Sequence, residues 1–293
     1  MLQRSPSYVV SLPSKDPLAA LLARILPDSL AYRLTRAKNV VFQDLSHRAI
    51  RRWPTQARRL LIGAVARNLP DDFDVATHFT PAYEPWDQRI AVVPDGDLFR
   101  VLSDGSASVV TDHIERFTAT GIELRSGRHL DADLIVTATG LKVQTLGGAA
   151  FDVDGEPVDT GRCHLYKGVL LSGVPNLALT IGYATASWTL KADLTARWVC
   201  RLLGHLDEQG VDQVVAPPPA PGEGSRPVID LTSGYVTRAL DVLPRQGDHR
   251  PWRSGRGYLD DLVTLRFSRL DDGVLRFART RADDPAAVSP ASP

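Results

Sequence analysis

The chain has 293 residues, a length that usually corresponds to two domains. Hydrophobic residues make up 43% and charged residues 23%, which allows a buried core and excludes wholesale disorder, collagen-like repeats and a coiled coil. The 34 basic and 34 acidic residues cancel, so no overall field attracts the protein to nucleic acid. With two cysteines, no membrane-length apolar run and no signal-peptide core, we expect a cytoplasmic protein without a disulfide scaffold or a cysteine-rich zinc site.

The charge is unevenly distributed along the chain. Residues 1–70 contain 12 basic residues and only three acidic ones, a net charge of +9 (12 − 3), so the remainder carries −9. Such a split favours a basic element that docks on an acidic one, or a basic face with an anionic partner.

The first residues have the character of a strand end. Leu2-Gln3 reads as the end of a strand, and Arg4-Ser5-Pro6 already leaves it. Because a buried strand needs neighbours to hold it, we expect the chain to begin inside a domain.

Residues 16–69 are predicted to be helical. Apolar residues from Leu18 to Leu26 recur at helix spacing, a second helix runs to about residue 50, and Pro54 starts a third. Arginines from Arg51 to Arg67 lie on these helices. They form either a solvated face that covers the rest of the protein or a basic amphipathic surface for anionic lipid.

The next segment changes from loop to β structure. Residues 71–95 are rich in turn formers and aromatic residues and are expected to form a loop. A short strand is expected at 109–111, and strands at 114–117 and 122–124 form a predicted hairpin.

Two apolar runs and one long helix follow. The runs at 133–138 and 176–181 are typical of strands buried on both faces. A helix is predicted from about 186 to 206, and after the stiff proline-rich linker at 217–222 the tail is expected to fray from about residue 283. The predicted buried face of the helix consists of Trp188, Ala192, Thr195, Val199 and Leu202.

Two features are typical of dinucleotide-binding folds. The run at 176–181 ends at Gly182, and Thr185 or Ser187 could cap the next helix, whose amino terminus would favour an anionic or electron-rich ring system. Arg4-Ser5 follows the first strand, where an arginine accommodates the 2′-phosphate of NADPH. The alternative for Arg4 is a solvated charge.

Several common motifs are missing from the sequence. No G-x-G-x-x-G stands between a predicted strand and helix, so no phosphate-cradling loop is predicted. The sequence also lacks H-E-x-x-H, G-x-S-x-G and a cysteine pair at metal spacing, and no metal site is expected.

Longer stretches carry a family resemblance. The chain resembles the C-terminal part of a Baeyer–Villiger-type flavin monooxygenase, in the branch that includes the mycobacterial ethionamide-activating enzyme. The resemblance is carried by MLQRSPSYVVSLP, LPDSLAYRLTRAKNV, HFTPAYEPWDQR, VPDGDLFRVL, DADLIVTATG, GYATASWTLKADLT and LPRQG.

The resemblance implies roles for individual residues. Arg4 and Ser5 match the pair that holds the NADPH 2′-phosphate. Arg89, preceded by the cofactor-binding Gln88, matches the arginine beside the flavin, where an always-charged donor stabilises a developing oxyanion. The alternative for Arg89 is a salt bridge to Asp87 or Glu84.

The hinge and the second cofactor segment match less completely. Thr139 and Gly140 match the hinge motif between nucleotide and flavin domains, where a glycine lets the backbone approach cofactor. Thr185 stands where close relatives carry asparagine and would lose an amide contact. Family members also contain two Gly-rich turns and an intervening fingerprint with His and Trp, and we expect all three to precede Met1.

The resemblance implies an α/β fold, the remainder of a two-dinucleotide-binding-domain (FAD/NADP Rossmann-like) fold that lacks its N-terminal FAD-binding segment. Residues 1–139 would form the NADP-binding remainder with the helical insertion at about 16–69. Residues 140–215 would belong to the FAD domain, and 216–293 would form linker and tail.

The implied activity is an NADPH- and FAD-dependent monooxygenation that uses O₂ on a ketone or a thio-compound, or on a nitrogen centre. One alternative is an inactive fragment without either Gly-rich loop. The other is a basic helical module that binds membrane surfaces peripherally.

Overall fold

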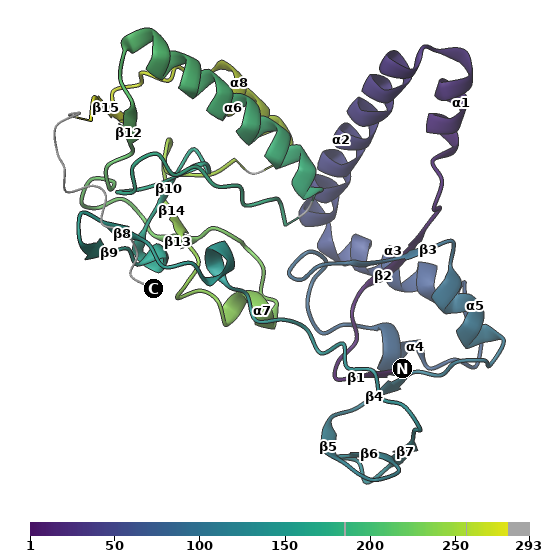
Figure 1. Cartoon of the computed structure of the whole chain (residues 1–293). Coiled ribbons are helices and arrows are strands. Elements are labelled where there is room, and N and C mark those ends of the chain that lie inside the picture. Colours follow the sequence, from purple (N-terminus) through teal and green to yellow (C-terminus); the bar gives the residue numbers. More distant parts are fainter. Residues whose placement is uncertain (185, 256, 281–293) are drawn as a thin grey trace. The chain divides into compact units, whose positions relative to one another are not determined.

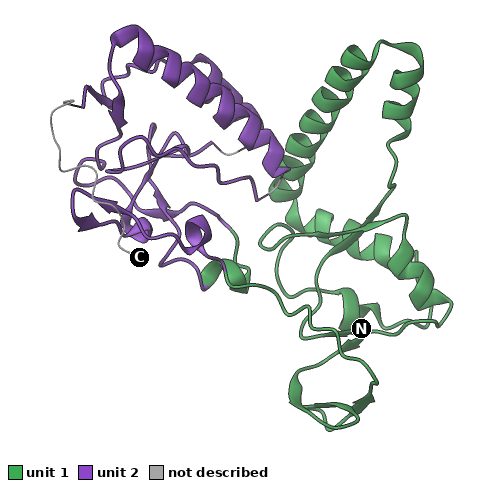
Figure 2. Cartoon of the chain, in the orientation of Figure 1, with its two compact units in different colours: residues 1–142, 231–237 green, residues 143–230, 238–293 purple. Residues whose placement is uncertain are grey.

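The computed structural model describes residues 1–184, 186–255 and 257–280. The chain divides into two compact units (Figure 2). Unit 1 comprises residues 1–142 and 231–237, and unit 2 comprises 143–230 and the chain from residue 238.

Unit 1 is built on two short pairs of parallel strands (Figure 1). Strand β1 (Leu2–Gln3) pairs with β4 (Val110–Thr111), and β2 (Val9–Leu12) pairs with β3 (Ala91–Pro94). The expected strands at the start of the chain and near residue 110 are therefore confirmed. The short helices α4 (Val75–Phe79) and α5 (Asp97–Ser103) accompany them, so part of the expected loop at 71–95 is regular structure.

The core of unit 1 joins these strands to the helices. Its buried members are Val9, Val65, Leu69, Phe79, Phe99, Leu102 and Val109. Burial of these side chains, from segments far apart in the sequence, holds the β2–β3 pair against α3, α4 and α5.

The three helices predicted within residues 16–69 are confirmed. They are α1 (Pro17–Ile25), α2 (Asp28–Arg52) and α3 (Pro54–Ala66). The Asp16 side chain accepts hydrogen bonds from the Leu18 and Ala19 N–H groups, a regular N-cap, and Pro17 occupies the first helical position. Helices α1 and α2 pack on each other but leave large apolar side chains exposed: Leu18, Leu21, Ile25, Leu30, Leu34, Val41, Phe42 and Leu45.

The predicted hairpin is confirmed and extended. Strands β5 (Ile114–Phe117), β6 (Gly121–Leu124) and β7 (His129–Asp131) form an antiparallel sheet. Gly121 has φ +155°, and a Cβ at this position would lie 1.9 Å from the Leu130 carbonyl oxygen. Only glycine allows this close approach of the two strands.

Unit 2 is centred on helix α6 (Trp188–Gln209), which packs against α8 (Tyr258–Phe267). Four antiparallel strand pairs complete the described part of this unit. They are β8 (Asp152–Val153) with β9 (Glu156–Pro157), β10 (Leu165–Tyr166) with β11 (Leu170–Leu171), β12 (Gln213–Val215) with β15 (Arg276–Ala278), and β13 (Arg226–Pro227) with β14 (Arg245–Gln246). The short helix α7 (Gly234–Thr237) belongs to unit 1.

The long helix is confirmed, but its predicted buried face is partly wrong. Thr195 and Leu202 are buried and Val199 packs partly on the core, whereas Trp188 and Ala192 are exposed. The apolar residues of the buried face repeat every fourth residue and are Leu190, Leu194, Trp198, Leu202 and Leu206, and Lys191 and Thr195 are buried beside them. The stripe that α8 and the strand pairs cover is therefore rotated from the predicted one.

Two predicted strands are wrong. The run at 133–138 forms no strand, and Leu134 and Val136 are 80% and 81% exposed. The run at 176–181 contains only a single bridge, between Ala178 and Leu170. A strand buried on both faces needs paired neighbours and two covering layers. In the described chain β1 and β4 pair with each other. They give residues 133–138 neither a paired neighbour nor a covering layer.

None of the helices in the described residues is both long enough and apolar enough to cross a membrane.

Candidate functional site

The segment that carries Arg89 begins with a tight turn. The Asp87 N–H donates to the Glu84 carbonyl at 3.0 Å, and the Asp87 carboxylate accepts from the Glu84 N–H at 3.2 Å. Trp86 has φ +72°, which is uncommon for a bulky residue. Pro85 is fully buried beside it. The turn is therefore held in a costly conformation, as is common near binding and catalytic groups.

Contacts from distant segments hold this turn at both ends. Arg51 on α2 pairs with Asp87 at 3.0 Å, between Nη1 and Oδ1. The Thr232 N–H and hydroxyl both donate to the Asp87 carbonyl, at 2.8 and 3.1 Å. The Asp87 carboxylate, considered above as a partner of Arg89, thus pairs with Arg51.

The other end of the turn is fixed through the Tyr83 carbonyl. Arg58 on α3 donates from Nη1 to this oxygen at 3.1 Å and to the Tyr8 hydroxyl at 2.7 Å. The Tyr8 hydroxyl donates to the same carbonyl at 2.8 Å. Arg51 and Arg58 therefore tie the helices to the turn and do more than form a solvated basic face.

The surroundings of the turn are positively charged and contain unsatisfied donors. His47 packs edge-on against Trp86, with ring centroids 5.4 Å apart. Burial and the nearby Arg51 lower the pKa of His47, which favours the neutral imidazole. The Trp86 Nε1 and the Tyr83 hydroxyl are buried without a hydrogen-bond partner in the described residues. Such orphaned donors are typical of a site that an absent group completes.

Arg89 is exposed, and the neighbouring Gln88 is half-buried. Ala91, the first residue of β3, donates its N–H to the Tyr8 carbonyl at 2.8 Å, so Arg89 lies at the amino end of the β2–β3 pair. Arg4 and Ser5 lie between β1 and β2, so in the chain they precede the amino end of β2. Both are exposed, and Arg4 forms no ion pair with a carboxylate of the described residues.

The hinge residues are placed separately. Thr139 and Gly140 are exposed in an irregular segment, and no hydrogen bond within the described chain joins them to Arg4 or Ser5. Gly140 has φ +100°, and no atom lies within 4 Å of the position that a Cβ would take. The backbone at Gly140 therefore has the accessibility expected of a glycine that approaches a ligand.

The segment from Gly182 to the start of α6, which contains Thr185, is described only in part. Thr185 lies outside the described residues. Ser187 is the N-cap residue of α6, but its hydroxyl contacts the Thr189 hydroxyl at 2.7 Å and makes no capping bond. The first N–H groups of α6 are thus left without this side-chain partner.

The sequence did not reveal the residues that hold the turn. Tyr8, Arg58 and Thr232 reach it from segments distant in sequence. An arginine on an amphipathic helix does not indicate in the sequence which carbonyl it will contact. Arg58, for example, donates to the Tyr83 carbonyl, 25 residues away in the chain.

Known proteins align with most of this chain. No protein-family model matches the chain. It is 50% identical over 282 residues to the FAD-containing monooxygenase EthA of Mycobacterium tuberculosis, a match that covers 96% of this chain and 58% of EthA. It is 49% identical over 284 residues to the "Probable FAD-binding monooxygenase AlmA" of Acinetobacter baylyi, which covers 94% of this chain and 56% of AlmA. Over nearly its whole length the chain is similar to a part of these FAD-containing monooxygenases. The resemblance inferred from the sequence is thereby confirmed.

A solved structure supports the fold. A steroid monooxygenase described as oxidised and bound to NADP matches with a TM-score of 0.62 at 16% identity, over 95% of this chain and 62% of that one. This likeness confirms the fold class, an α/β fold that corresponds to part of a FAD/NADP monooxygenase fold. The chain spans about 58% of the length of the EthA sequence that it matches.

Proposed function

We propose that this chain provides part of an NADPH- and FAD-dependent monooxygenase that acts on a small carbonyl compound or on a sulfur or nitrogen centre. The identity of 50% to EthA over 96% of the chain carries this proposal. For a ketone, the balanced reaction consumes ketone, O₂, NADPH and a proton and yields ester, NADP⁺ and water. One oxygen atom enters the ester and the other leaves as water.

Arg4 and Ser5 are proposed to hold the NADPH 2′-phosphate. Arg4 is exposed and has no carboxylate partner in the described chain, so its guanidinium is available for an anion. The Ser5 hydroxyl can add a second donor. Charge-assisted bonds of this kind are roughly twice as strong as neutral ones.

Arg89 is proposed as the catalytic cation. When bound, FAD supplies the reduced ring that reacts with O₂. The turn that bears Arg89 is anchored by Arg51, Arg58 and Thr232, so the guanidinium starts from a fixed backbone. A guanidinium keeps its proton and can stabilise negative charge that develops on oxygen without reorganising.

The remaining proposed cofactor contacts are Gln88, Thr139, Gly140 and Thr185. Gln88 precedes Arg89, and the open surroundings of Gly140 support a close backbone approach. With these residues we propose a division at 139/140, between an NADP-binding part and a FAD-binding part that runs to residue 215.

The first test is flavin retention. The purified chain is incubated with FAD and desalted, and its visible spectrum is recorded. A retained flavin band supports cofactor binding by this chain, and a colourless protein supports the alternative that it is an inactive fragment.

The role of Arg89 is tested in the form of the protein that retains flavin. Arg89→Ala should still oxidise NADPH but form no oxygenated ketone product. Arg116→Ala, which removes an exposed arginine paired with Glu123, is the matched control and should keep product formation. Normal ketone oxidation by Arg89→Ala would refute the role.

A second candidate function is peripheral binding to anionic membranes. The exposed apolar side chains of α1 and α2 support it, together with the basic residues of this segment. Arg52 and Arg59 are exposed and do not anchor the turn, so Arg52→Gln with Arg59→Gln tests the idea. Salt-sensitive pelleting with phosphatidylglycerol vesicles that is weaker in this variant supports binding, and no pelleting of the unmodified chain refutes it.

A further inference from the structure

Unit 2 contains a pocket that the proposed monooxygenase chemistry does not use. Its volume is about 450 Å³, within the usual range for small-molecule sites. Four basic side chains line it: Lys167, Arg250, Arg253 and Arg269. The only acidic side chain among its described lining residues is Asp272.

Lys167 and Asp272 neutralise each other. The Lys167 side chain is 5% exposed, and its Nζ lies 2.9 Å from Asp272 Oδ2 and 3.1 Å from the Arg269 carbonyl oxygen. The Asp272 carboxylate also accepts hydrogen bonds from the Tyr166 hydroxyl and the Val274 N–H. With its lone pairs engaged, Asp272 is poorly placed to pair with the arginines of the pocket.

Arg250, Arg253 and Arg269 bring three further positive charges to the pocket. None of the three forms an ion pair with a carboxylate in the described part of the chain. Positive charges that line one pocket favour an anion there.

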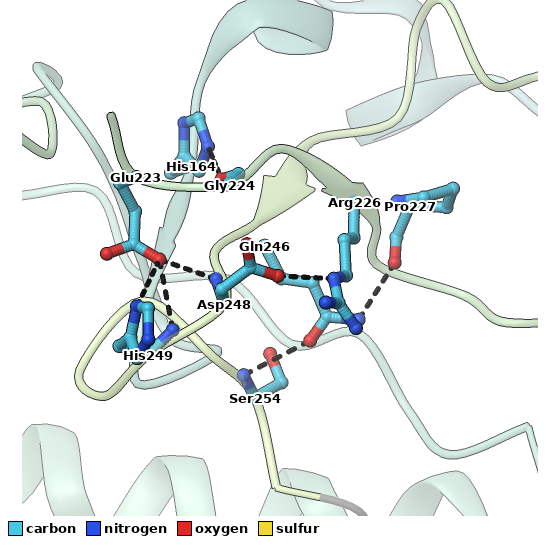
Figure 3. A network of polar contacts seen from close by, with 9 residues as sticks. All are labelled: His164, Glu223, Gly224, Arg226, Pro227, Gln246, Asp248, His249 and Ser254. Carbon is cyan, nitrogen blue, oxygen red and sulfur yellow. Dashed lines mark hydrogen bonds and ion pairs between the residues drawn. The ribbon is translucent and has the colours of Figure 1, made fainter. Parts of the chain in front are cut away.

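The loop that bears Arg250 and Arg253 is firmly held (Figure 3). Glu223 accepts from the N–H groups of Asp248 and His249, and Asp248 pairs with Arg226. These bonds engage the carboxylates of Glu223 and Asp248 with other partners. They explain why the acidic residues beside the loop do not compensate its arginines.

Backbone bonds fix the same loop relative to the pocket floor. The Arg253 N–H donates to the His249 carbonyl at 2.8 Å, and the Lys167 N–H donates to the Pro251 carbonyl at 2.7 Å. Ser254 donates its N–H to Gln246 Oε1 at 3.2 Å (Figure 3). The arginines thus start from a preorganised backbone, which lowers the entropic cost of binding.

The end of α8 in the pocket would by itself disfavour an anion, because a helix carboxyl terminus is the negative end of the helix dipole. Arg201 compensates this end. It donates to the carbonyls of Leu265, Arg266 and Ser268 at 2.7, 2.8 and 3.0 Å.

Part of the pocket wall is apolar. It consists of Val263 and Phe267 of α8, with Pro251 and Val274, and the hydroxyl residues Thr264 and Ser268 lie between them in the lining. Phe267 is 69% exposed, so a ligand would cover it. We propose that this pocket binds a carboxylate with an apolar body, its head between the guanidinium groups and its chain against Phe267. A planar guanidinium matches a carboxylate with two parallel hydrogen bonds.

Decanoate is the probe, and decanol, with the same chain and no charge, is the matched ligand. Binding to the 293-residue chain is measured by isothermal titration calorimetry at low salt. Decanoate should bind with 1:1 stoichiometry, and decanol should bind at least tenfold more weakly. Arg253→Gln and Arg269→Gln should each weaken decanoate binding by roughly tenfold to a hundredfold, the range for one charged hydrogen-bond partner.

Arg276→Gln is the control variant, because Arg276 lies on β15 of the same unit, is exposed, and stands outside the pocket lining. It should leave decanoate affinity within twofold. Absence of decanoate binding, equal binding of decanol, or equal loss of affinity in the Arg276→Gln control would each overturn the proposal. Circular dichroism of each variant establishes that a lost affinity is not lost folding.

Discussion

At the scale of single residues, Gly182 shows how local sequence and packing are linked. It precedes α6, and a Cβ at this position would lie 2.1 Å from the Trp188 ring. The indole occupies the space that any side chain at Gly182 would need. The glycine is therefore explained by close packing between the segment and the first residue of α6.

Gly182→Ala should destabilise the protein by about 1–3 kcal/mol, the usual cost of overpacking, measured by urea unfolding. Gly204→Ala is the matched control, because Gly204 is within α6 and no atom lies within 4 Å of its Cβ position. It should raise stability by about 0.5–1 kcal/mol, since alanine is the better helix former. Equal effects of the two substitutions would contradict the packing explanation.

A second residue-scale prediction concerns pH. Burial raises the pKa of Asp272, but hydrogen bonds from Tyr166 and Lys167 outweigh it and hold the pKa below the ordinary 3.8. The pair therefore stabilises the fold above the unfolded-state pKa, and this contribution is lost as the pH falls through the lower folded-state value.

Asp272→Asn should lower stability at pH 7, because Lys167 is 5% exposed and loses its charged partner. It should also flatten the decline of stability below about pH 4, where the carboxylate would have titrated. Denaturant titrations from pH 2.5 to 7 measure both effects. Asp271→Asn changes the exposed neighbouring carboxylate and should reproduce neither.

At the scale of elements, α6 and α8 are joined by a buried polar cluster. Lys191 on α6 and Asp261 on α8 are 3% and 2% exposed, with Nζ 2.7 Å from Oδ2. The Tyr183 hydroxyl donates to the same oxygen at 2.8 Å, and the Gly255 N–H donates to the other at 3.1 Å. Because Lys191, Tyr183 and Gly255 all donate to the one carboxylate of Asp261, the cluster fixes how α6 and α8 pack on each other.

Lys191→Met should destabilise the chain by about 3–5 kcal/mol, because it leaves the Asp261 charge buried without its cation. Adding Asp261→Leu to Lys191→Met should recover part of the loss, since the second change removes that charge. Chemical unfolding of the single and double variants measures this. Arg197→Met, which breaks the exposed Arg197–Asp193 pair on α6, should cost no more than about 1 kcal/mol.

At the scale of the whole molecule, charge distribution sets solution behaviour. The net charge is zero at pH 7, while residues 1–70 carry +9 and the remainder −9. When the net charge is zero, copies of the chain do not repel one another overall. The basic part of one copy can then attract the acidic part of another. Self-association should therefore be strongest near pH 7 and weaker at pH 9 and at 0.5 M NaCl. Static light scattering measures it, and a minimum in scattering near pH 7 would contradict the argument.

Local patterns were sufficient for several elements. The three N-terminal helices follow from apolar spacing and from Pro54, and the hairpin at 114–124 follows from its two short apolar strands and the turn that ends at Gly121. These patterns extend over only a few residues, so the elements can be predicted without knowing which distant segments they contact. The strands expected at 133–138 and 176–181 failed because apolar runs form buried strands only where neighbours pair with them.

In the candidate site, too, some residues could be predicted from local sequence and others could not. Arg4, Ser5, Gln88 and Arg89 could be selected from sequence, because their residue types and neighbouring motifs match the family. Arg51, Arg58 and Thr232 could not, because their significance depends on which carbonyl or carboxylate lies across the fold. The pocket between the 250–253 loop and α8 likewise depends on partners from four separate segments.

The sequence by itself determined the family resemblance, the helical region, the hairpin and the residue types of the proposed site, because each is encoded in short-range pattern or in residue identity. The tertiary structure decided which face of α6 is buried, which arginines hold the turn before Arg89, and which have no carboxylate partner among the described residues. The physical reason is that burial and ion pairing are properties of two surfaces in contact. One segment of sequence describes only one of those surfaces.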